Sequence, residues 1–569
     1  ILLILSIAFL VHASTPVELK TKIGTFSTVV DNEESSIGFL GIPYAKPMTA
    51  NERWTPPKTA TCFNEDAIFD CSSFAPKCNQ GKALLSTKSE TSEDCLYLNI
   101  WVPKNIVSNG KIKEDSNLPV MVFIHGGAFV LGSGADPYID GNDFANNDVI
   151  LVSINYRLGI MGFLALPELL EENINSENFG LLDQRLALLW VSQNIKYFGG
   201  NGDAITVFGE SAGAMSCLWQ LVATEENVPE DEKVLKHIQG FIIQSPADLE
   251  TPKCYESYEQ QKKILNTYFD CDNLEGKEFI SCLRNIPADV LVDSLPGFGS
   301  ARKIFFHTSS EEVYMFSPCT GNSDSVFSQP IRESIQSGNH AKDKKIIIGT
   351  TKDEGTLFMM LNFIVYSNFD TETIENFIKA GFFDHDDDDD ATKIVNYYLH
   401  ERSDLEDPVV LAEILNDIYF QCGVEEFAKL MSNYQDDVYR YVFTHFPSSG
   451  AQNLGVFHAS ELVFVFGKPI GGNLFPKSFT EEEKLLSKNM NNYWSNFAKY
   501  GNPNGKESIH NWNKYGEERN AIILDSTIED QTNYKEEVCG FWKSIYPTGV
   551  PLLHGGAHEL MHEPIHSFL

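Results

Sequence analysis

The stretch VFGESAGAMS, from Val207 to Ser216, places a serine between two glycines directly after an apolar, β-branched run. Residues 209–213 fit the pattern G-x-S-x-G, in which a strand turns sharply into a helix and exposes the serine at the tip. The flanking glycines avoid clashes with the neighbouring strand and helix. Ser211 is therefore either a capping residue or a nucleophile, and these five positions alone do not decide between the two.

The chain is long and strongly acidic. It has 569 residues, of which 43% are hydrophobic, and this is ample for a large buried core. With 43 Lys and Arg against 79 Asp and Glu, the formal net charge is −36. A polyanion of this size repels phosphate backbones and anionic lipid surfaces, so nucleic acid is not an expected partner.

Residues 1–13, ILLILSIAFLVHA, are apolar and end in a small-residue pattern that is typical of a signal-peptide end. We expect cleavage between Ala13 and Ser14, with the charged start of the peptide preceding Ile1; the alternative is a buried first strand. No other stretch reaches the 18 or so apolar residues that span a bilayer. The expected layout is a signal peptide at 1–13, a single domain at 14–550 and a tail at 551–569. Such a protein enters the secretory pathway and is secreted or held in a vesicle.

The cysteine content fits an oxidising compartment. There are 11 cysteines, so at least one thiol is unpaired within the chain. None forms a C-x-x-C pair, which argues against zinc ribbons, and no His/Cys cluster suggests a metal. The acidic run at 384–390 is expected to be a solvated loop, because it lacks the alternating ligand spacing of a calcium-binding EF-hand.

Apolar, β-branched runs alternate with helical patterns along the chain. The runs that favour short buried strands are Leu118–Gly127, Val149–Gly159, Ile205–Gly209, Gly240–Ser245, Lys344–Thr350 and Val438–Phe446. Helices are expected between them, for example over Leu181–Ile195 and Ala212–Leu221. Buried strands separated by helices predict an α/β fold with a large, mostly parallel sheet covered on both faces.

Three further segments fit a nucleophile at Ser211. The bend HGGAF (His125–Phe129) follows a strand and can aim backbone N–H groups at an oxyanion. In this architecture the chain order is Ser, then Asp or Glu, then His. KDEG (Lys352–Gly355) and GVFHASE (Gly455–Glu461) follow later strands in that order. Taken alone, either of these two segments would more often be surface loop.

These motifs together resemble a type-B carboxylesterase of the cholinesterase/carboxylesterase family, an α/β-hydrolase. FGGNGDAITVFGESAG (Phe198–Gly213) and EDCLYLNIW (Glu93–Trp101) are similar to both signature stretches of that family. Further similar stretches are GIPYAKP (Gly41–Pro47), NYRLG (Asn155–Gly159), GLLDQRLALLWVSQNI (Gly180–Ile195) and NFAKYGNPN (Asn496–Asn504). The resemblance covers nearly the whole mature chain and implies an active site at the bottom of a gorge.

The resemblance implies a role for each motif residue. Ser211 matches the nucleophile, His458 the general base, and Glu354 the acid that orients the imidazole, with Asp353 the alternative acid. The backbone N–H groups that match the oxyanion hole belong to Gly127, Ala128 and Ala212. Ala128 departs from the glycine that is common in the family, and its methyl group crowds the acyl pocket. Glu210 matches a buried acid beside the nucleophile, although a plain turn residue is the alternative.

The implied chemistry is hydrolysis of a carboxylic ester through an acyl-enzyme, and it needs no metal and no cofactor. The expected partner is a small-molecule ester, and assembly with further copies of the chain is left open. The alternatives are an adhesion or binding homologue without activity, a storage or assembly protein with a vestigial site, and a cholinesterase, all of which would share this fold. Competent residues at all three catalytic positions argue against the first of these alternatives.

The resemblance also implies three disulfides, Cys78–Cys95, Cys271–Cys282 and Cys422–Cys539. The cysteines left over are Cys62, Cys71, Cys217, Cys254 and Cys319. Among these, a Cys62–Cys71 bridge would close an additional short loop, and Cys217 is expected to be a buried free thiol. Two structural ion pairs of the family are matched by Arg157 with Asp183 and by Arg53 with Glu93.

Cholinesterases hold a quaternary ammonium against a tryptophan in the loop closed by the first disulfide. In this chain that loop is NQGKALLSTKSETSED (Asn79–Asp94), which contains no aromatic residue. We therefore expect neutral small or medium acyl esters to be preferred over choline esters.

Overall fold

The computed structural model describes residues 14–31, 33–81, 90–113, 116–173, 176–247, 251–295, 316–361, 388–401, 407–505 and 510–547. The expected signal peptide at 1–13, the expected tail at 551–569 and most of the acidic run at 384–390 lie outside these residues. Strand β1 begins at Ser14. None of the described helices is long and apolar enough to cross a lipid bilayer.

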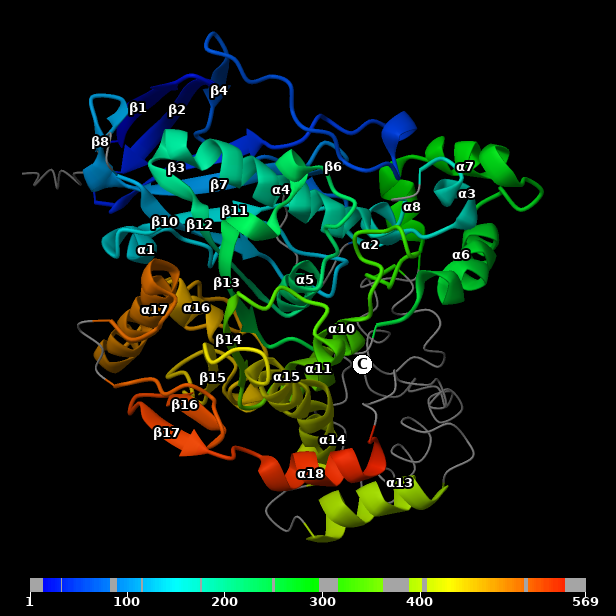
Figure 1. The fold of residues 1–569 in the computed structure, drawn as a ribbon, viewed down its shortest axis with the longest axis vertical. Helices are drawn as coiled ribbons and strands as arrows, with labels where there is room; N and C mark the ends of the chain where they lie inside the picture. Colours follow the sequence, from blue (N-terminus) through cyan, green and yellow to red (C-terminus); the bar gives the residue numbers. More distant parts are fainter. Residues whose placement is uncertain are drawn as a thin grey trace, which may run out of the picture.

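A ten-stranded sheet runs through the molecule in the order β17-β16-β15-β14-β13-β12-β10-β11-β7-β3 (Figure 1). Its strands, in chain order, are β3 (Ser36–Pro43), β7 (Tyr97–Pro103), β10 (Leu118–Ile124), β11 (Ile150–Ile154), β12 (Gly200–Glu210), β13 (Ile238–Gln244), β14 (Lys345–Thr351), β15 (Val438–Phe443), β16 (Asn520–Leu524) and β17 (Glu529–Thr532). The strands from β11 to β16 in this order pair in parallel. Only β7, β3 and β17, at the two edges, pair antiparallel. The mostly parallel sheet expected from the apolar runs is confirmed.

Helices cover both faces of the sheet. Alternate residues of each strand point to opposite faces, so each strand contributes side chains to two cores. On β10, Val120, Val122 and Ile124 join one core with helices α4, α5, α10 and α15. Met121 and Phe123 join a second core, on the other face, with α1, α16 and α17. The bounds of these helices are α1 (Asn142–Asn146), α4 (Phe179–Asn194), α5 (Ala212–Leu221), α10 (Ile331–Ser337), α15 (Cys422–Ser432), α16 (Leu462–Val465) and α17 (Glu481–Tyr500).

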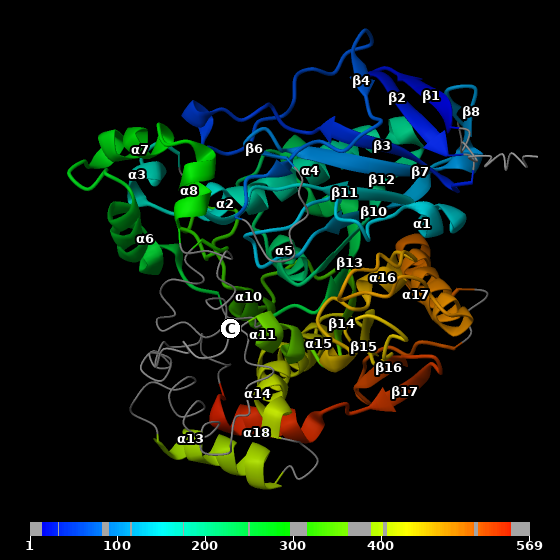
Figure 2. The ribbon, with the colours of Figure 1, turned by 180° about the vertical axis from the view of Figure 1, so that it is seen from behind.

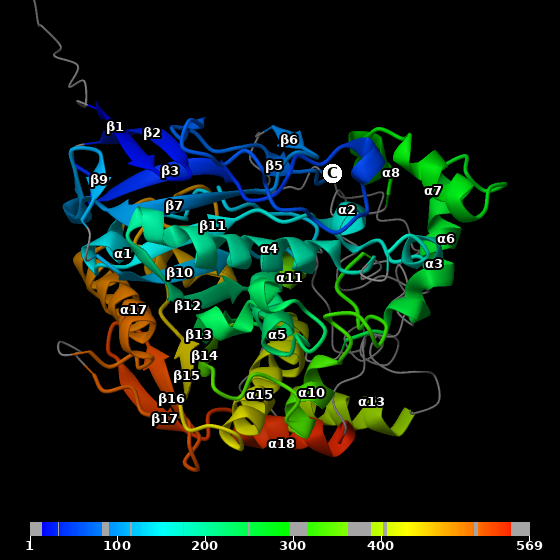
Figure 3. The same cartoon turned by 45° about the horizontal axis from the view of Figure 1, so that its top comes forward.

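The remaining elements form satellites around this sandwich (Figures 2 and 3). A small sheet consists of β1 (Ser14–Thr21), β2 (Gly24–Asp31) and β4 (Ile68–Asp70). One helical group with its own core comprises α2 (Gly159–Phe163), α3 (Pro167–Leu170), α6 (Cys254–Tyr268), α7 (Gly276–Arg284) and α8 (Ala288–Ser294). The other comprises α11 (Gly355–Leu361), α13 (Asp388–Val395), α14 (Asp407–Leu415) and α18 (Glu536–Ile545). Two short ribbons complete the strands, β5 (Lys77–Cys78) with β6 (Thr91–Ser92) and β8 (Val107–Ser108) with β9 (Lys111–Ile112).

Four disulfides cross-link the chain, and the one between Cys422 and Cys539 joins α18 to α15 of the sandwich. The three expected bridges, Cys78–Cys95, Cys271–Cys282 and Cys422–Cys539, are all formed. A fourth, Cys254–Cys319, was not expected from the sequence. This disulfide forms because the backbones of Lys253 and Thr320 pair in an isolated parallel β-bridge, which brings the start of α6 beside a distant segment.

The additional bridge between Cys62 and Cys71 is not formed, so that expectation was wrong. Both thiols are free, since Cys62 lies on the surface whereas Cys71 is buried in the core. Cys217 is free and buried in α5, as expected. The two ion pairs matched from the sequence are also present, Arg157 with Asp183 at 2.7 Å and Arg53 with Glu93 at 2.6 Å.

Candidate active site

Ser211 lies at a sharp turn between the end of β12 and the start of α5. Its backbone has φ 57° and ψ −120°, a conformation that L-residues rarely adopt and that is costly to hold. The flanking glycines make this turn fit: a Cβ on Gly209 would lie 2.5 Å from the backbone of Gly213, and one on Gly213 would lie 2.0 Å from the carbonyl of Ile124. The strand–turn–helix context predicted from G-x-S-x-G is therefore present.

The elbow is also held from the neighbouring strand. The backbone N–H of Ser211 donates to the carbonyl of Gln244, at the end of β13, over 2.9 Å. The Ser211 hydroxyl makes no hydrogen bond with any other described residue, and the side chain is only partly buried. The turn thus places this hydroxyl, without a hydrogen bond to other described residues, at the carboxyl end of the parallel strands, where ligands bind in open α/β sheets.

The glycine-rich bend after β10 lies directly against this elbow. A Cβ on Gly126 would lie 2.8 Å from the backbone oxygen of Glu210 and 3.1 Å from Cβ of Ser211. Gly127 and Ala128 both have positive φ, 105° and 51°. Within the described part of the chain, neither of their N–H groups has a hydrogen-bond acceptor.

Ala212 supplies a third backbone donor at the same place. It is the first residue of α5, and the first N–H groups of a helix have no acceptor inside the helix. Three N–H groups are thus available beside the serine, as an oxyanion hole requires.

The carboxyl group of Glu354 is fixed at the end of β14. Its Oε1 accepts hydrogen bonds from the Ser245 hydroxyl (2.6 Å) and from the N–H of Thr351 (2.7 Å). Its Oε2 lies 2.5 Å from Nδ1 of His458. Glu354 is completely buried, so this contact is shielded from water.

The other ring nitrogen of His458 faces the elbow. Nε2 lies 3.0 Å from Oε1 of Glu210, in an ion-pair contact without the angles of a hydrogen bond. A Cβ on Gly126 would lie 2.8 Å from the Glu210 carboxylate and 3.1 Å from Cβ of Ser211, so His458, Glu210 and Ser211 gather around one point. The structure therefore brings Ser211, Glu354 and His458, which lie in three different motifs of the sequence, to one site. Active-site hydrogen bonds are often incomplete without substrate.

Three buried carboxylates surround the His458 imidazole, those of Glu354, Glu210 and Glu461. Burial disfavours the charged imidazole, but Glu210 and Glu354 outweigh it and raise the pKa of His458 to about 9. Burial also raises the pKa of Glu210, although His458 opposes that shift. For Glu461, burial and the negative charge of Glu354 both raise the pKa. The cluster therefore titrates as a unit that shares protons.

Several residues of the site carried no signal in the sequence. Glu461 binds the amide of Gln244, which in turn accepts from the indole of Trp494. Phe358 and Phe420 stack on each other and contact the His458 ring, with centroids 4.9 and 5.1 Å away. These rings give the imidazole an apolar wall. Only packing between α11 and the short helix Asn416–Gln421, which follows α14, brings them there.

Asp353, the alternative acid, points away from the imidazole. Its Oδ2 accepts from the N–H of Val456 over 2.8 Å, and its own N–H donates to the Val456 carbonyl. Of the two adjacent acids, only Glu354 contacts His458.

Comparison with known proteins shows which family the chain belongs to. The family model described as "Carboxylesterase family" matches residues 17–542. The acetylcholinesterase of Bungarus fasciatus is 31% identical over 545 residues, covering 91% of this chain and 84% of that protein. The cholinesterase of Mus musculus is 30% identical over 536 residues, with 90% and 83% covered. The solved structure of a thermophilic pNB esterase superposes with a TM-score of 0.71 at 30% identity, covering 92% of this chain and 99% of that one. The chain therefore belongs to the carboxylesterase family and is a carboxylic ester hydrolase.

Proposed function

We propose that the protein is a serine esterase in which Ser211 is the nucleophile, His458 the general base and Glu354 the orienting acid. The observation that carries the proposal is the 2.5 Å contact between Glu354 and Nδ1 of His458, with Nε2 turned toward the elbow. Glu354 fixes the tautomer with the proton on Nδ1 and stabilises the imidazolium that forms when Ser211 is deprotonated.

The reaction follows from this arrangement in two halves. The Ser211 oxygen attacks the ester carbonyl while Nε2 takes the hydroxyl proton, and the oxyanion accepts from the N–H groups of Gly127, Ala128 and Ala212. His458 then gives its proton to the leaving alcohol. Water, deprotonated by the same nitrogen, hydrolyses the acyl-enzyme and regenerates the Ser211 hydroxyl.

Glu210 and Glu461 place additional negative charge around the imidazole. They favour the imidazolium and so support proton transfer from Ser211, but because they raise the pKa of His458 they also keep it protonated to higher pH. We propose that Glu210 supports His458 electrostatically, since it contacts Nε2 rather than Nδ1.

The proposal extends to the substrate and the compartment. Neutral esters with small or medium acyl groups are the proposed substrates, because the sequence between Cys78 and Cys95 has no aromatic residue to hold a quaternary ammonium. Folding in the secretory pathway is proposed from the four disulfides, which form and persist in oxidising compartments.

A fluorophosphonate probe tests the nucleophile directly, because it reacts only with an activated serine. Peptide mapping of the labelled protein is expected to find the probe on Ser211, and Ser211→Ala is expected to lose both labelling and turnover of a p-nitrophenyl ester. The variant should melt like the wild type, since alanine removes only the hydroxyl. Label on a different serine, or more than about 5% residual turnover in the variant, would remove Ser211 from this role.

A further inference from the structure

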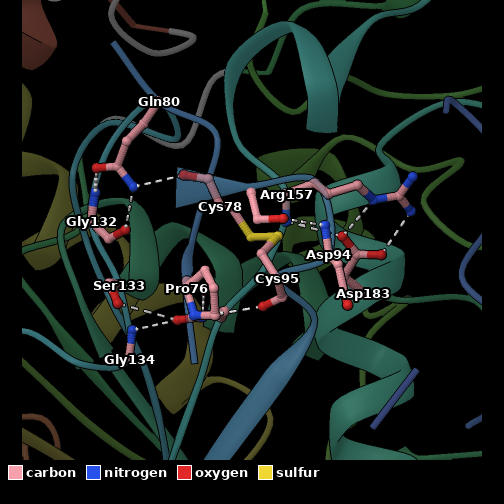
Figure 4. The surroundings of a disulfide bond; sticks show 12 residues. Pro76, Cys78, Gln80, Asp94, Cys95, Gly132, Ser133, Gly134, Arg157 and Asp183 are labelled. Carbon is pink, nitrogen blue, oxygen red and sulfur yellow. Dashed lines mark hydrogen bonds and ion pairs between the residues drawn. A yellow bond between two sulfur atoms is a disulfide. The ribbon is translucent and has the colours of Figure 1, made fainter. Parts of the chain in front are cut away.

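Gln80 connects the first disulfide to the chain that follows the oxyanion bend. Figure 4 shows its side-chain amide reaching across to Gly132. The amide oxygen accepts from the N–H of Gly132 over 3.0 Å, and the amide nitrogen donates to the Gly132 carbonyl over 3.0 Å. The same nitrogen donates to the carbonyl of Cys78, also over 3.0 Å. Both backbone groups of Gly132 are thus bound by one side chain.

Gly132 in turn is packed against the start of the bend. A Cβ at this position would lie 2.4 Å from Nδ1 of His125 and 2.5 Å from the carbonyl of Gly126. His125 is itself fixed, with Nδ1 2.8 Å from the Gly126 carbonyl and its ring stacked on Tyr156. A shift of Gly132 toward the bend therefore has to displace His125 and Gly126.

The segment between Gly126 and Gly132 transmits such a shift to the oxyanion donors. The carbonyl of Gly127 accepts from the N–H groups of Val130 and Leu131, which closes a tight turn. A Cβ on Gly127 would lie 2.2 Å from the Leu131 carbonyl. Gly127 and Ala128 therefore sit on a short, closely packed turn whose far end is Gly132.

A second amide anchors the residues that follow. Asn155, at the end of β11, accepts from the N–H of Gly134 over 2.9 Å and donates to the carbonyls of Pro76 and Cys95. The chain around the Cys78–Cys95 bridge is thus joined to residues 132–134 by two side-chain amides, those of Gln80 and Asn155. Of these two amides, it is that of Gln80 that binds Gly132, the residue packed against the bend.

We infer that Gln80 is a positioning residue of the oxyanion hole, acting through Gly132 on the N–H groups of Gly127 and Ala128. The inference rests on the proposed function and deepens it. Its physical basis is that oxyanion donors stabilise a transition state only when they point at the developing charge, so a displacement of about 1 Å can cost up to about 100-fold in rate.

The test compares Gln80→Glu with Gln193→Glu. A carboxylate at position 80 still accepts from Gly132 N–H, but it cannot donate and it repels the carbonyls of Gly132 and Cys78. The control makes the same change at Gln193, whose amide donates to the exposed carbonyl of Asp231 far from the bend. Rates are expressed per active site titrated with the fluorophosphonate probe.

For Gln80→Glu, kcat for a p-nitrophenyl ester is expected to fall about 10- to 100-fold with KM changed less than about twofold. The inhibition constant of a trifluoromethyl ketone, which forms the oxyanion, should rise by a similar factor. The control should change neither quantity.

A pH series adds a signature that general destabilisation does not produce. The protonated introduced carboxyl can donate again, so the variant-to-wild-type ratio of kcat should rise as pH falls. His458 titrates in both proteins, so its effect on kcat largely cancels in the ratio. Burial lowers the pKa of the neighbouring His125 to about 4, so the series is kept at pH values above that pKa. Melting curves at each pH check that the fold is retained.

Hydrogen exchange provides a readout that does not depend on turnover. Amides of a peptide covering residues 125–134 should exchange faster in Gln80→Glu than in wild type, and not in Gln193→Glu. Unchanged exchange, or a loss of kcat without weaker ketone binding, would overturn the inference. If the wild type hydrolysed no ester, the proposed function would fall, and exchange alone would decide whether Gln80 anchors the bend.

Discussion

Asp353 and Glu354 are adjacent in the chain, yet their carboxylates bind two different points of one loop. Glu354 contacts the His458 ring, whereas Asp353 binds the backbone of Val456, two residues earlier. The first contact orients the imidazole, and the second places the segment that carries it. A Cβ on Gly455 would lie 2.4 Å from the Asp353 carboxylate, so the loop and the carboxylate are in close contact.

Substitutions at these two acids should therefore have unequal effects. Glu354→Gln removes the charge that stabilises the imidazolium, and kcat is expected to fall about 10²- to 10⁴-fold. Asp353→Asn keeps an oxygen that accepts from Val456 N–H, so its rate should stay within a few-fold of wild type. Steady-state kinetics on a p-nitrophenyl ester measure both, and the opposite ranking would mean that Asp353 is the acid.

Removal of the Glu210 charge should shift the pH dependence. Glu210 helps to raise the pKa of His458, so Glu210→Gln makes the neutral imidazole easier to form and lowers that pKa. Because the proposed mechanism needs neutral His458, the acidic limb of the kcat/KM profile should move to lower pH. Glu481→Gln, at a side chain that is 90% exposed, serves as the control and should leave the profile unchanged. If the acidic limb of Glu210→Gln stayed in place or moved to higher pH, the electrostatic role of Glu210 would be contradicted.

The choice between neutral and cationic substrates can be measured with matched thioesters. A cation–π contact contributes up to about 2 kcal/mol when desolvated, and the disulfide loop holds no aromatic residue to make it. We expect a choline thioester to be turned over no more efficiently than its neutral isostere with the same acyl group. A tenfold preference for the cationic thioester would show that another part of the site binds ammonium, as expected of a cholinesterase.

The cysteine pairing predicts a specific pattern of alkylation. In the native protein only Cys62 should react rapidly, since Cys217 is buried and burial raises the pKa of Cys71 to about 12. Non-reducing peptide mapping should recover Cys254 linked to Cys319. That bridge closes a loop of 65 residues, so replacing both cysteines by alanine should cost about 4 kcal/mol of stability by loop-closure entropy. A Cys62–Cys71 peptide in the map would contradict the pairing.

The parallel sheet and the elbow could be predicted from the sequence because their signals are local. Buried strands are apolar and β-branched, and the turn at Ser211 needs glycines at fixed offsets. His458 and Glu354 were found through chain order and family resemblance, and the structure brings them into contact.

The features that were missed depend on contacts between distant segments. Cys254 and Cys319 become neighbours only through the pairing of Lys253 with Thr320, which has no local signal. The contact between Gln80 and Gly132 has no local signal either, because the Gln80 side chain hydrogen-bonds to the backbone of Gly132. A glutamine close to a cysteine and a glycine in a glycine-rich turn are both common, so neither one indicates the other.

The order of strands in the sheet has a consequence for biosynthesis. From β12 to β17 the strands lie side by side in the order in which they leave the ribosome. The elbow is therefore made well before the strand and loop that bring His458, by roughly 10–50 s at ordinary translation rates. During that interval a nascent chain carries a serine with no base beside it. With His458 as the proposed base, esterase activity is withheld until the far half of the sheet has been added, and a chain that ends before His458 is expected to be inert whatever its state of folding.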